Sequence, residues 1–220
     1  MQLNDAIQSR RTVRGFTEQQ VTPSLLKQIF SNAQYAPSNC NTQPWHTFVV
    51  SGERCRALAD NLYQHVSAGN PPQPDFGFMA SYEGIFRERQ VACAQELYKN
   101  MGIERTDKAG RMQALLENYH FFDAPHVAFI GMPRSYSTVN AVDIGIYAQT
   151  LMLLMTEQGI ASCPQGALAY YPDRVRQELG IDQQTGILLG ISFGYENTHN
   201  PANKTRVGRA PLAQCTTFID

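Results

Sequence analysis

Three groups of basic and hydrogen-bonding residues are the strongest candidates for chemistry in this sequence. One follows the N-terminal segment (Arg10, Arg11, Thr12, Arg14), one is the run at 38–43, and one lies near the C-terminus (Lys204, Arg206, Arg209). Taken singly, each is typical of a solvated surface or an ordinary loop. Together they suggest a phosphate site, because a phosphate needs several fixed donors and arginine can bind it with two parallel hydrogen bonds.

Other catalytic patterns are missing from the sequence. It has no G-x-G-x-x-G after a predicted strand, no P-loop, no G-x-S-x-G and no H-E-x-x-H, which argues against triphosphate binding, a Rossmann site, an elbow hydrolase and a zincin. The five histidines have no metal-ligand spacing, so we expect no metal site. The five cysteines are odd in number and contain no C-x-x-C pair, which favours free thiols in a reducing cytoplasm.

Composition sets the class of protein. The 220 residues are 43% hydrophobic and 17% charged, which predicts a folded chain, and we expect one domain over residues 1–220. The net charge of −1 supplies no basic field for a nucleic acid or a membrane surface. The apolar stretch at 144–155 is interrupted by polar residues and is shorter than the ~20 residues of a bilayer span. The N-terminus lacks the features of a secretory signal, so we expect a cytoplasmic protein.

The order of four motifs resembles the FMN-dependent nitroreductase family. These are S-R-R-T-V-R-G-F at 9–16, A-P-S-N-C-N-T-Q-P-W at 36–45, C-P-Q-G at 163–166 and K-T-R-V-G-R at 204–209. The resemblance spans nearly the whole chain and departs mainly at 70–120. It implies an α+β three-layer sandwich, with a central, mainly antiparallel sheet flanked by helices, and an intertwined homodimer with two FMN sites.

The resemblance also implies roles for single residues. Arg10, Lys204 and Arg206 match the positions that hold the FMN phosphate, with Arg11 beside them. Thr12 matches a ribityl or phosphate contact, and Arg14 matches the cation beside flavin N1 and O2, where negative charge accumulates on reduction. The remaining matches are a loop that reaches the flavin from the other subunit (Pro37, Ser38, Asn39, Asn41) and a segment near flavin N5 (Pro164, Gln165, Gly166). The backbone N–H of Gln165 or Gly166 would bond N5.

The implied activity is electron transfer from NADH or NADPH through FMN to a nitroaromatic or quinone, by a ping-pong mechanism in one pocket. Such a scheme needs no side-chain nucleophile. The alternatives are another flavin reaction (ene-reduction, reductive dehalogenation, flavin breakdown), a flavin carrier or sensor without turnover, and an interaction domain whose arginines only solubilise it. Seven aromatic residues in or next to the variable stretch could stack on a planar acceptor, although ordinary core packing is the better explanation for any single one of them: Phe76, Phe78, Tyr82, Phe86, Tyr119, Phe121 and Phe122.

The elements that must position these residues follow from periodicity and turn signals. We predict helices at 3–9, from a Thr22 cap to near Pro37, around 58–66, through much of 79–121, at 139–158 and at 172–179 with Gly180 closing the last. Strands are predicted at 46–50, 127–131 and 187–193, and 161–168 is interpreted as a connection. The helix at 139–158 is apolar on almost every face, so it must be covered by the core or by a second subunit. The extended tail through Phe218 could wrap around that second subunit.

Overall fold

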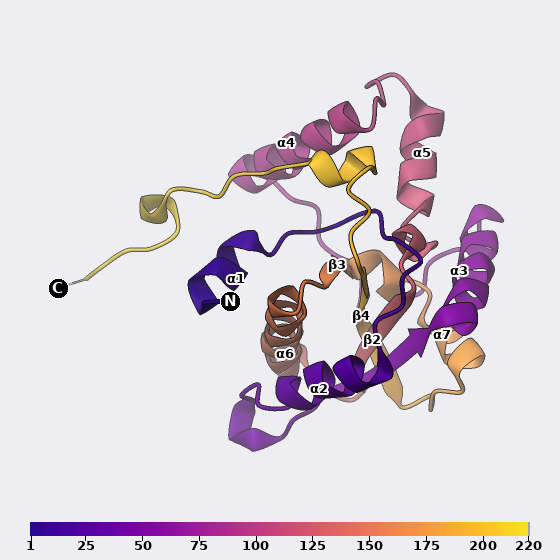
Figure 1. Cartoon of the computed structure of the whole chain (residues 1–220), viewed down its shortest axis with the longest axis vertical. Helices are drawn as coiled ribbons and strands as arrows, with labels where there is room; N and C mark the ends of the chain where they lie inside the picture. Colours follow the sequence, from indigo (N-terminus) through magenta and orange to yellow (C-terminus); the bar gives the residue numbers. More distant parts are fainter. Residues whose placement is uncertain (220) are drawn as a thin grey trace.

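The computed structural model describes residues 1–219 and places one sheet between two layers of helices (Figure 1). Within these residues the sheet has four strands in the order β1-β2-β4-β3. Their bounds are β1 His46–Ser51, β2 His126–Pro133, β3 Ala161–Gln165 and β4 Thr185–Gly194. Every pairing is antiparallel, which confirms the predicted α+β class and sandwich.

The alternation of side chains along β2 builds the two cores. Val127 and Phe129 face one layer, which contains Leu58 and Leu62 of α3 (Gly52–Ser67) and Val175 of α7 (Pro172–Leu179). Ala128 and Ile130 face the other layer, formed by α2 (Pro23–Ala33) and α6 (Thr138–Glu157). Because successive strand residues point to opposite faces, a sheet with an apolar residue at every position must be covered on both sides.

Local signals are confirmed at several element ends. The Thr22 side chain caps α2 by accepting a hydrogen bond from the Leu25 N–H at 3.4 Å. Gly180 closes α7 with φ 68°, a left-handed conformation that favours glycine. Helix α2 ends at Ala33, earlier than predicted, because the next N–H groups, from Gln34 and Tyr35, form tighter turn bonds to Ser31 and Asn32.

One prediction about an element is wrong. Residues 161–165 form β3, a strand at the edge of the sheet, where Pro164 is tolerated because its nitrogen faces the outer side of the strand, away from β4. The region predicted to be helical at 79–121 contains two helices, α4 (Gly84–Asn100) and α5 (Lys108–Leu116), and the turn between them includes Gly102 with φ 69°. The remaining elements are α1 (Leu3–Ser9) and short 3₁₀ turns at Asn39–Asn41, Phe121–Asp123, Gly166–Ala169, Pro201–Lys204 and Leu212–Gln214.

A buried histidine ties the segment before α2 to the sheet. His126 Nε2 accepts the Val21 N–H at 2.9 Å, and Nδ1 lies 2.7 Å from the Ser51 hydroxyl. Because Nε2 is an acceptor here, Nδ1 carries the proton and donates to Ser51. Burial lowers the pKa of His126 to about 4, so the ring is neutral at physiological pH.

Helix α6 is buried on one side only. Its inner side, with Ile144, Tyr147 and Leu151, belongs to the core, whereas Val139 and Val142 on its outer side are exposed. By length and composition alone, α6 is the one helix in the part of the chain described that could cross a membrane, a test that core helices of soluble proteins also pass. The final segment, beyond residue 205, extends away from the body on the side where α1 lies (Figure 1).

Candidate functional site

The segment at 14–15 meets the segment that carries Lys204 and Arg206 at Asn203, which is 4% exposed. Its Oδ1 accepts the Arg14 N–H at 2.7 Å, and its Nδ2 donates to the Gly15 carbonyl at 2.8 Å and the Asn197 carbonyl at 2.9 Å. These three bonds satisfy the side-chain amide in a place that water does not reach. Asn203 therefore joins the N-terminal arginine segment to the C-terminal one.

The arginines around this junction fall into two kinds. Arg11 forms an ion pair with Glu196 and also donates to the Asn203 carbonyl at 3.2 Å, so its charge is balanced inside the chain. Arg206 donates to the carbonyls of Asn203 and Thr205 at 2.7 and 2.9 Å, and over residues 1–219 neither it nor Arg10 has a carboxylate ion-pair partner. Arg10 and Arg206 thus each carry a positive charge that no carboxylate within residues 1–219 balances.

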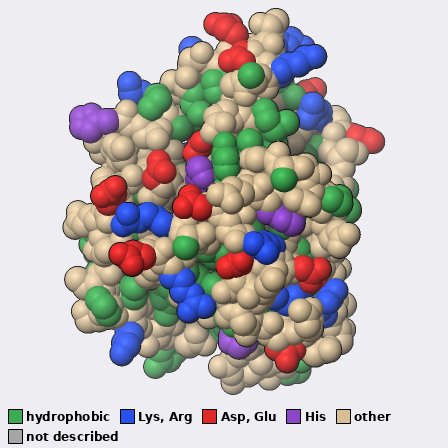
Figure 2. Space-filling view, turned by 90° about the vertical axis from the view of Figure 1, so that its right-hand side faces the viewer, with side chains coloured by type: hydrophobic (Ala, Val, Ile, Leu, Met, Phe, Trp, Pro, Cys, Tyr) green, Lys and Arg blue, Asp and Glu red, His purple; other side chains and the backbone are tan. Residues whose placement is uncertain are grey.

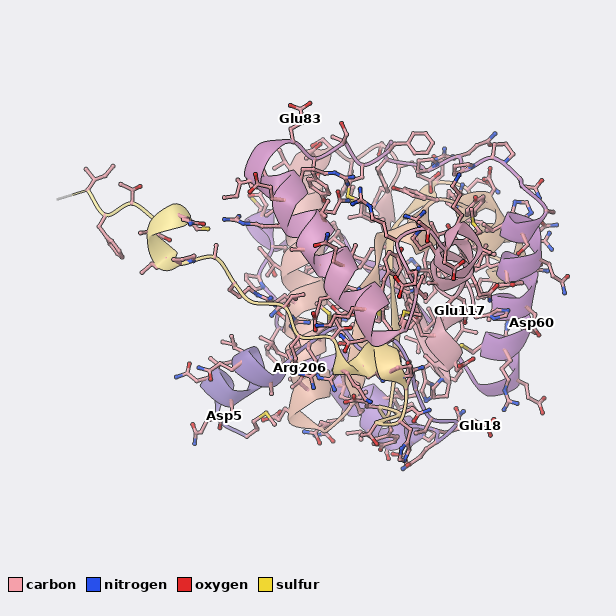
Figure 3. The ribbon with its side chains drawn as sticks, turned by 90° about the horizontal axis from the view of Figure 1, so that it is seen from above. Asp5, Glu18, Asp60, Glu83, Glu117 and Arg206 are labelled. Atoms are coloured by element: carbon pink, nitrogen blue, oxygen red, sulfur yellow. The ribbon has the colours of Figure 1, made fainter. Side chains whose placement is uncertain are left out.

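The positive charge of Arg209 reaches Arg10. The pKa of Arg10 is lowered by its partial burial and, to a smaller extent, by the positive charge of Arg209. Lys204 and Arg206 are exposed on the short 3₁₀ turn and just after it, where the chain passes α4 (Figure 3). Cations crowded in this way favour a bound anion, because like charges repel unless a counter-charge separates them.

The segment that carries Arg10 to Arg14 runs along the open edge of β3. Thr12 pairs with Ser162 in a parallel bridge, and the Val13 N–H donates to the Ser162 carbonyl at 3.1 Å. Backbone groups alternate sides along a strand, so the positions facing this edge after Ser162 are Pro164 and Gly166. Gly166 is exposed and has open space beside it, which leaves its backbone accessible next to the arginine segment.

The Gln165 side chain is committed to the protein. It is 3% exposed, its Nε2 donates to the Asn118 carbonyl at 2.8 Å, and its Oε1 accepts the Ser192 hydroxyl. Asn118 and Arg14 line a cavity of about 330 Å³, whose other walls come from α4, α5 and the segment at 200–202. Sequence analysis did not find Asn118 or Asn203, and no signal in the sequence distinguishes these asparagines from the others.

The loop at 37–43 is held in a fixed shape, but at the other end of the molecule. The Asn39 N–H donates to buried Asp143 of α6 at 3.1 Å, and the Gln43 N–H donates to the Ser38 hydroxyl at 2.9 Å. Cys40 and Asn41 adopt left-handed φ values of 49° and 55°. The loop follows α2 at the lower left of Figure 1, whereas the turn with Lys204 lies at the top beside α4. One chain therefore does not bring Pro37, Ser38, Asn39 and Asn41 to the arginine cluster.

The candidate acceptor-stacking residues divide into a buried and an exposed set, apart from Phe76, which is partly buried against the core that contains α6. Tyr119, Phe121 and Phe122 are buried, which agrees with core packing as their role; of the three, Phe122 also lines the 330 Å³ cavity. Phe78, Tyr82 and Phe86 are exposed, because they lie at the start of the α4 excursion, which has no buried residue in its helix. These three remain candidates for acceptor contact.

Thiol and metal chemistry find no support in the geometry. Burial raises the pKa of Cys55 and Cys163 to about 12, and the nearby charge of Arg14 only partly opposes this effect at Cys163. Such thiols stay protonated and unreactive. Residues 1–219 contain no cluster of three or more His, Cys, Asp or Glu side chains that could hold a metal ion.

Figure 2 shows acidic and basic side chains interspersed over one face of the molecule.

Comparison with known proteins agrees with this architecture. A profile of the nitroreductase family matches residues 7–195. The nitroreductase NfnB of Mycolicibacterium smegmatis is 42% identical over 96% of this chain and 90% of its own, and a 4-nitrobenzoate reductase of Nocardioides is 30% identical over 97% and 88%.

Solved structures match as closely. The FMN-dependent NfnB of Mycobacterium smegmatis in complex with NADPH superposes with a TM-score of 0.94 at 39% identity, over 99% of this chain and 97% of that one. The FMN- and NADPH-dependent NfnB of Sphingopyxis strain HMH gives 0.95 at 34% identity over both full chains. These relatives bear out the activity class and the cofactors expected from the sequence, and the chain belongs to the nitroreductase family.

Proposed function

We propose that this protein passes electrons from NADPH or NADH through bound FMN to nitroaromatic or quinone acceptors. The observation that carries the proposal is the junction at Asn203, which bonds both the Arg14 N–H and the Arg206 side chain beside the open edge of β3. Within residues 1–219, neither Arg206 nor Arg10 has a carboxylate ion-pair partner. Named relatives that reduce nitrobenzoate and nitrobenzene support the acceptor class. The single FMN-binding domain over residues 1–220 is part of this proposal.

The residues at the junction fit the phosphate end of FMN. Arg10, Lys204 and Arg206 offer charged donors, and each charge-assisted bond contributes roughly 1.5 to 3 kcal/mol. Three such bonds supply much of the ~8 kcal/mol of a micromolar affinity. Thr12, on the same edge, offers a hydroxyl to the phosphate or the ribityl chain. Arg11 adds little charge of its own, because Glu196 already balances it.

The residues further along the edge fit the ring end. Bound FMN would supply hydride acceptance and donation at N5. The backbone N–H of Gly166 faces the open edge and is the better placed of the two candidate donors, because Gln165 bonds to β4 on the other side. Pro164 has no N–H and leaves that edge clear. Arg14 would stabilise negative charge at N1 and O2 and so favour reduction of the ring.

The loop at 37–43 completes the site only from a second copy. We infer a homodimer in which Pro37, Ser38, Asn39 and Asn41 of each chain reach the flavin held by the other. The exposed apolar side of α6, with Val139, Val142 and Ile146, would form part of the dimer interface. The C-terminal tail, with exposed Leu212 and Phe218, extends away from the body of the molecule and would pack against the second subunit. Exposed residues of this kind are costly in a monomer. The proposal includes a cytoplasmic location.

The test is FMN binding followed by turnover. We expect flavin fluorescence to be quenched on titration with a Kd in the micromolar range or below, and two chains per particle in light scattering. Arg10→Ala should weaken FMN binding by 10-fold or more, whereas Arg105→Ala, an exposed arginine in the turn after α4, should not. Protein that binds no FMN refutes the proposal. Protein that binds FMN but oxidises neither NADPH nor NADH with 4-nitrobenzoate or a quinone is a carrier or performs another flavin reaction.

A further inference from the structure

A second cationic cavity lies next to the proposed phosphate cluster. It measures about 750 Å³ and lies between α4 and the segment at 206–215 (Figure 3). Three arginines line it: Arg89 from α4, and Arg206 and Arg209 from the segment. Its one acidic lining residue in the part of the chain described is Glu96.

The arginines of this cavity have no carboxylate partner within residues 1–219. Arg89 donates to the Gln214 side-chain carbonyl at 3.0 Å, and Arg209 donates to the carbonyls of Val207 and Gly208 at 3.2 and 3.1 Å. These neutral acceptors orient the guanidinium groups but leave their charge in place. Each guanidinium has five N–H donors, so donors remain for an anion.

Glu96 does not neutralise them. Its Oε1 accepts a hydrogen bond from Asn100 at 3.1 Å, one turn further along α4, and it forms no ion pair with Arg89 or Arg209. The net charge of the lining is therefore positive, since three cations face one carboxylate. Of these cations, only Arg206 belongs to the set that matches the FMN phosphate.

Arg206 belongs to both sites, because it lines the cavity and is one of the cations proposed to hold the FMN phosphate. The cavity therefore lies beside the phosphate end of the proposed flavin site, and the charge of its Arg209 also reaches Arg10. A dinucleotide whose nicotinamide lies over the flavin ring must place its adenosine half outside the ring pocket. NADPH carries a phosphate monoester on that half and NADH does not, which makes this group the natural partner for two arginines.

We propose that Arg89 and Arg209 bind the 2′-phosphate of NADPH and make the protein prefer NADPH to NADH. This inference rests on the proposed function. The cavity volume is within the range of small-molecule sites and large enough for a ribose phosphate. Arg89 belongs to the variable stretch, so donor choice would be set by the part of the chain that departs most from the family pattern.

The direct test measures binding without turnover. The FMN-loaded protein is titrated by calorimetry with 2′,5′-ADP and with 5′-AMP, which differ in the 2′-phosphate. We expect 2′,5′-ADP to bind at least tenfold more tightly, and Arg89→Gln and Arg209→Gln each to remove most of that difference. Arg87→Gln is the matched control, because Arg87 lies on the same helix, contacts Gln90 and does not line the cavity.

A second measurement follows the reductive half-reaction anaerobically. In Arg89→Gln the apparent Kd for NADPH should rise about tenfold, that for NADH should change less than twofold, and FMN affinity should stay at the wild-type value. Equal effects on NADPH and NADH, or displacement of FMN by 2′,5′-ADP, would overturn the inference. A higher KM for 4-nitrobenzoate with NADPH unaffected would assign the arginines to an acceptor carboxylate instead. Failure of FMN binding refutes the proposed function, whereas a flavoprotein that does not discriminate the 2′-phosphate refutes only this inference.

Discussion

Replacing Asn203 with leucine should loosen the junction between the segment at 14–15 and the segment that carries Arg206. The change removes three side-chain hydrogen bonds and leaves the Arg14 N–H without a partner in a buried place, whereas the Gly15 and Asn197 carbonyls keep the backbone N–H groups of Asn197 and Asn200. A net contribution of about 1 kcal/mol for each bond gives a loss of about 3 kcal/mol in the free energy of unfolding. For a chain of this size, that loss lowers Tm by roughly 6 to 12 °C.

The assay combines calorimetric unfolding of the FMN-free protein with a flavin titration. In Asn203→Leu both Tm and FMN affinity should fall, because the same side chain holds the fold and the spacing of the cations. Lys204→Ala is the control. Its exposed ammonium is expected to contribute to phosphate binding alone, so FMN affinity should fall about tenfold while Tm stays within about 1 °C.

Wild-type Tm and FMN affinity in Asn203→Leu would refute the reasoning. If that variant does not fold, Asn203→Asp provides the measurement. It keeps an acceptor for the Arg14 N–H but cannot donate to the Gly15 and Asn197 carbonyls, so it should be destabilised.

Three further outcomes are expected. Burial holds the pKa of His126 near 4, below its unfolded value of about 6.5, so the unfolded state binds the proton first as the pH falls. The stability that is present above pH 6.5 should therefore be lost between about pH 6.5 and 4. A pH series of Tm should show a smaller slope over this range in His126→Gln than in the wild type. Asp143→Ala removes the acceptor of the Asn39 N–H and should weaken FMN binding in the dimer by about tenfold in a flavin titration, whereas unchanged affinity would exclude a positioning role. Gly190→Ala would place a Cβ 2.4 Å from Leu168 and should lower Tm by several degrees, a result contradicted by a wild-type melting curve.

Much of the fold could be predicted because its signals are local. The Thr22 cap, the Gly180 terminator and the apolar periods of the helices depend on residues a few positions apart, and the structure confirms them. The strands of β1, β2 and β4 were recognisable from their apolar runs. Strand β3 was not, because its Pro164 reads as a breaker until its place at the sheet edge is known.

The sequence by itself determined the family, and it contains the arginines and the loop at 37–43 on which the proposed site depends. Only the tertiary structure decided which of these residues meet. It paired Arg11 with Glu196, committed Gln165 to Asn118 and separated the loop at 37–43 from the arginines.

The physical reason is the length of chain between partners. A helix cap is a contact between near neighbours, whereas Asn203 bonds Arg14 and Gly15 across 189 and 188 residues. No local pattern specifies such a contact, because in an unfolded chain the Asn203 amide and the backbone groups that it bonds would all form equally good hydrogen bonds to water. Burial of the junction removes that alternative and makes Asn203 the link that holds the site together.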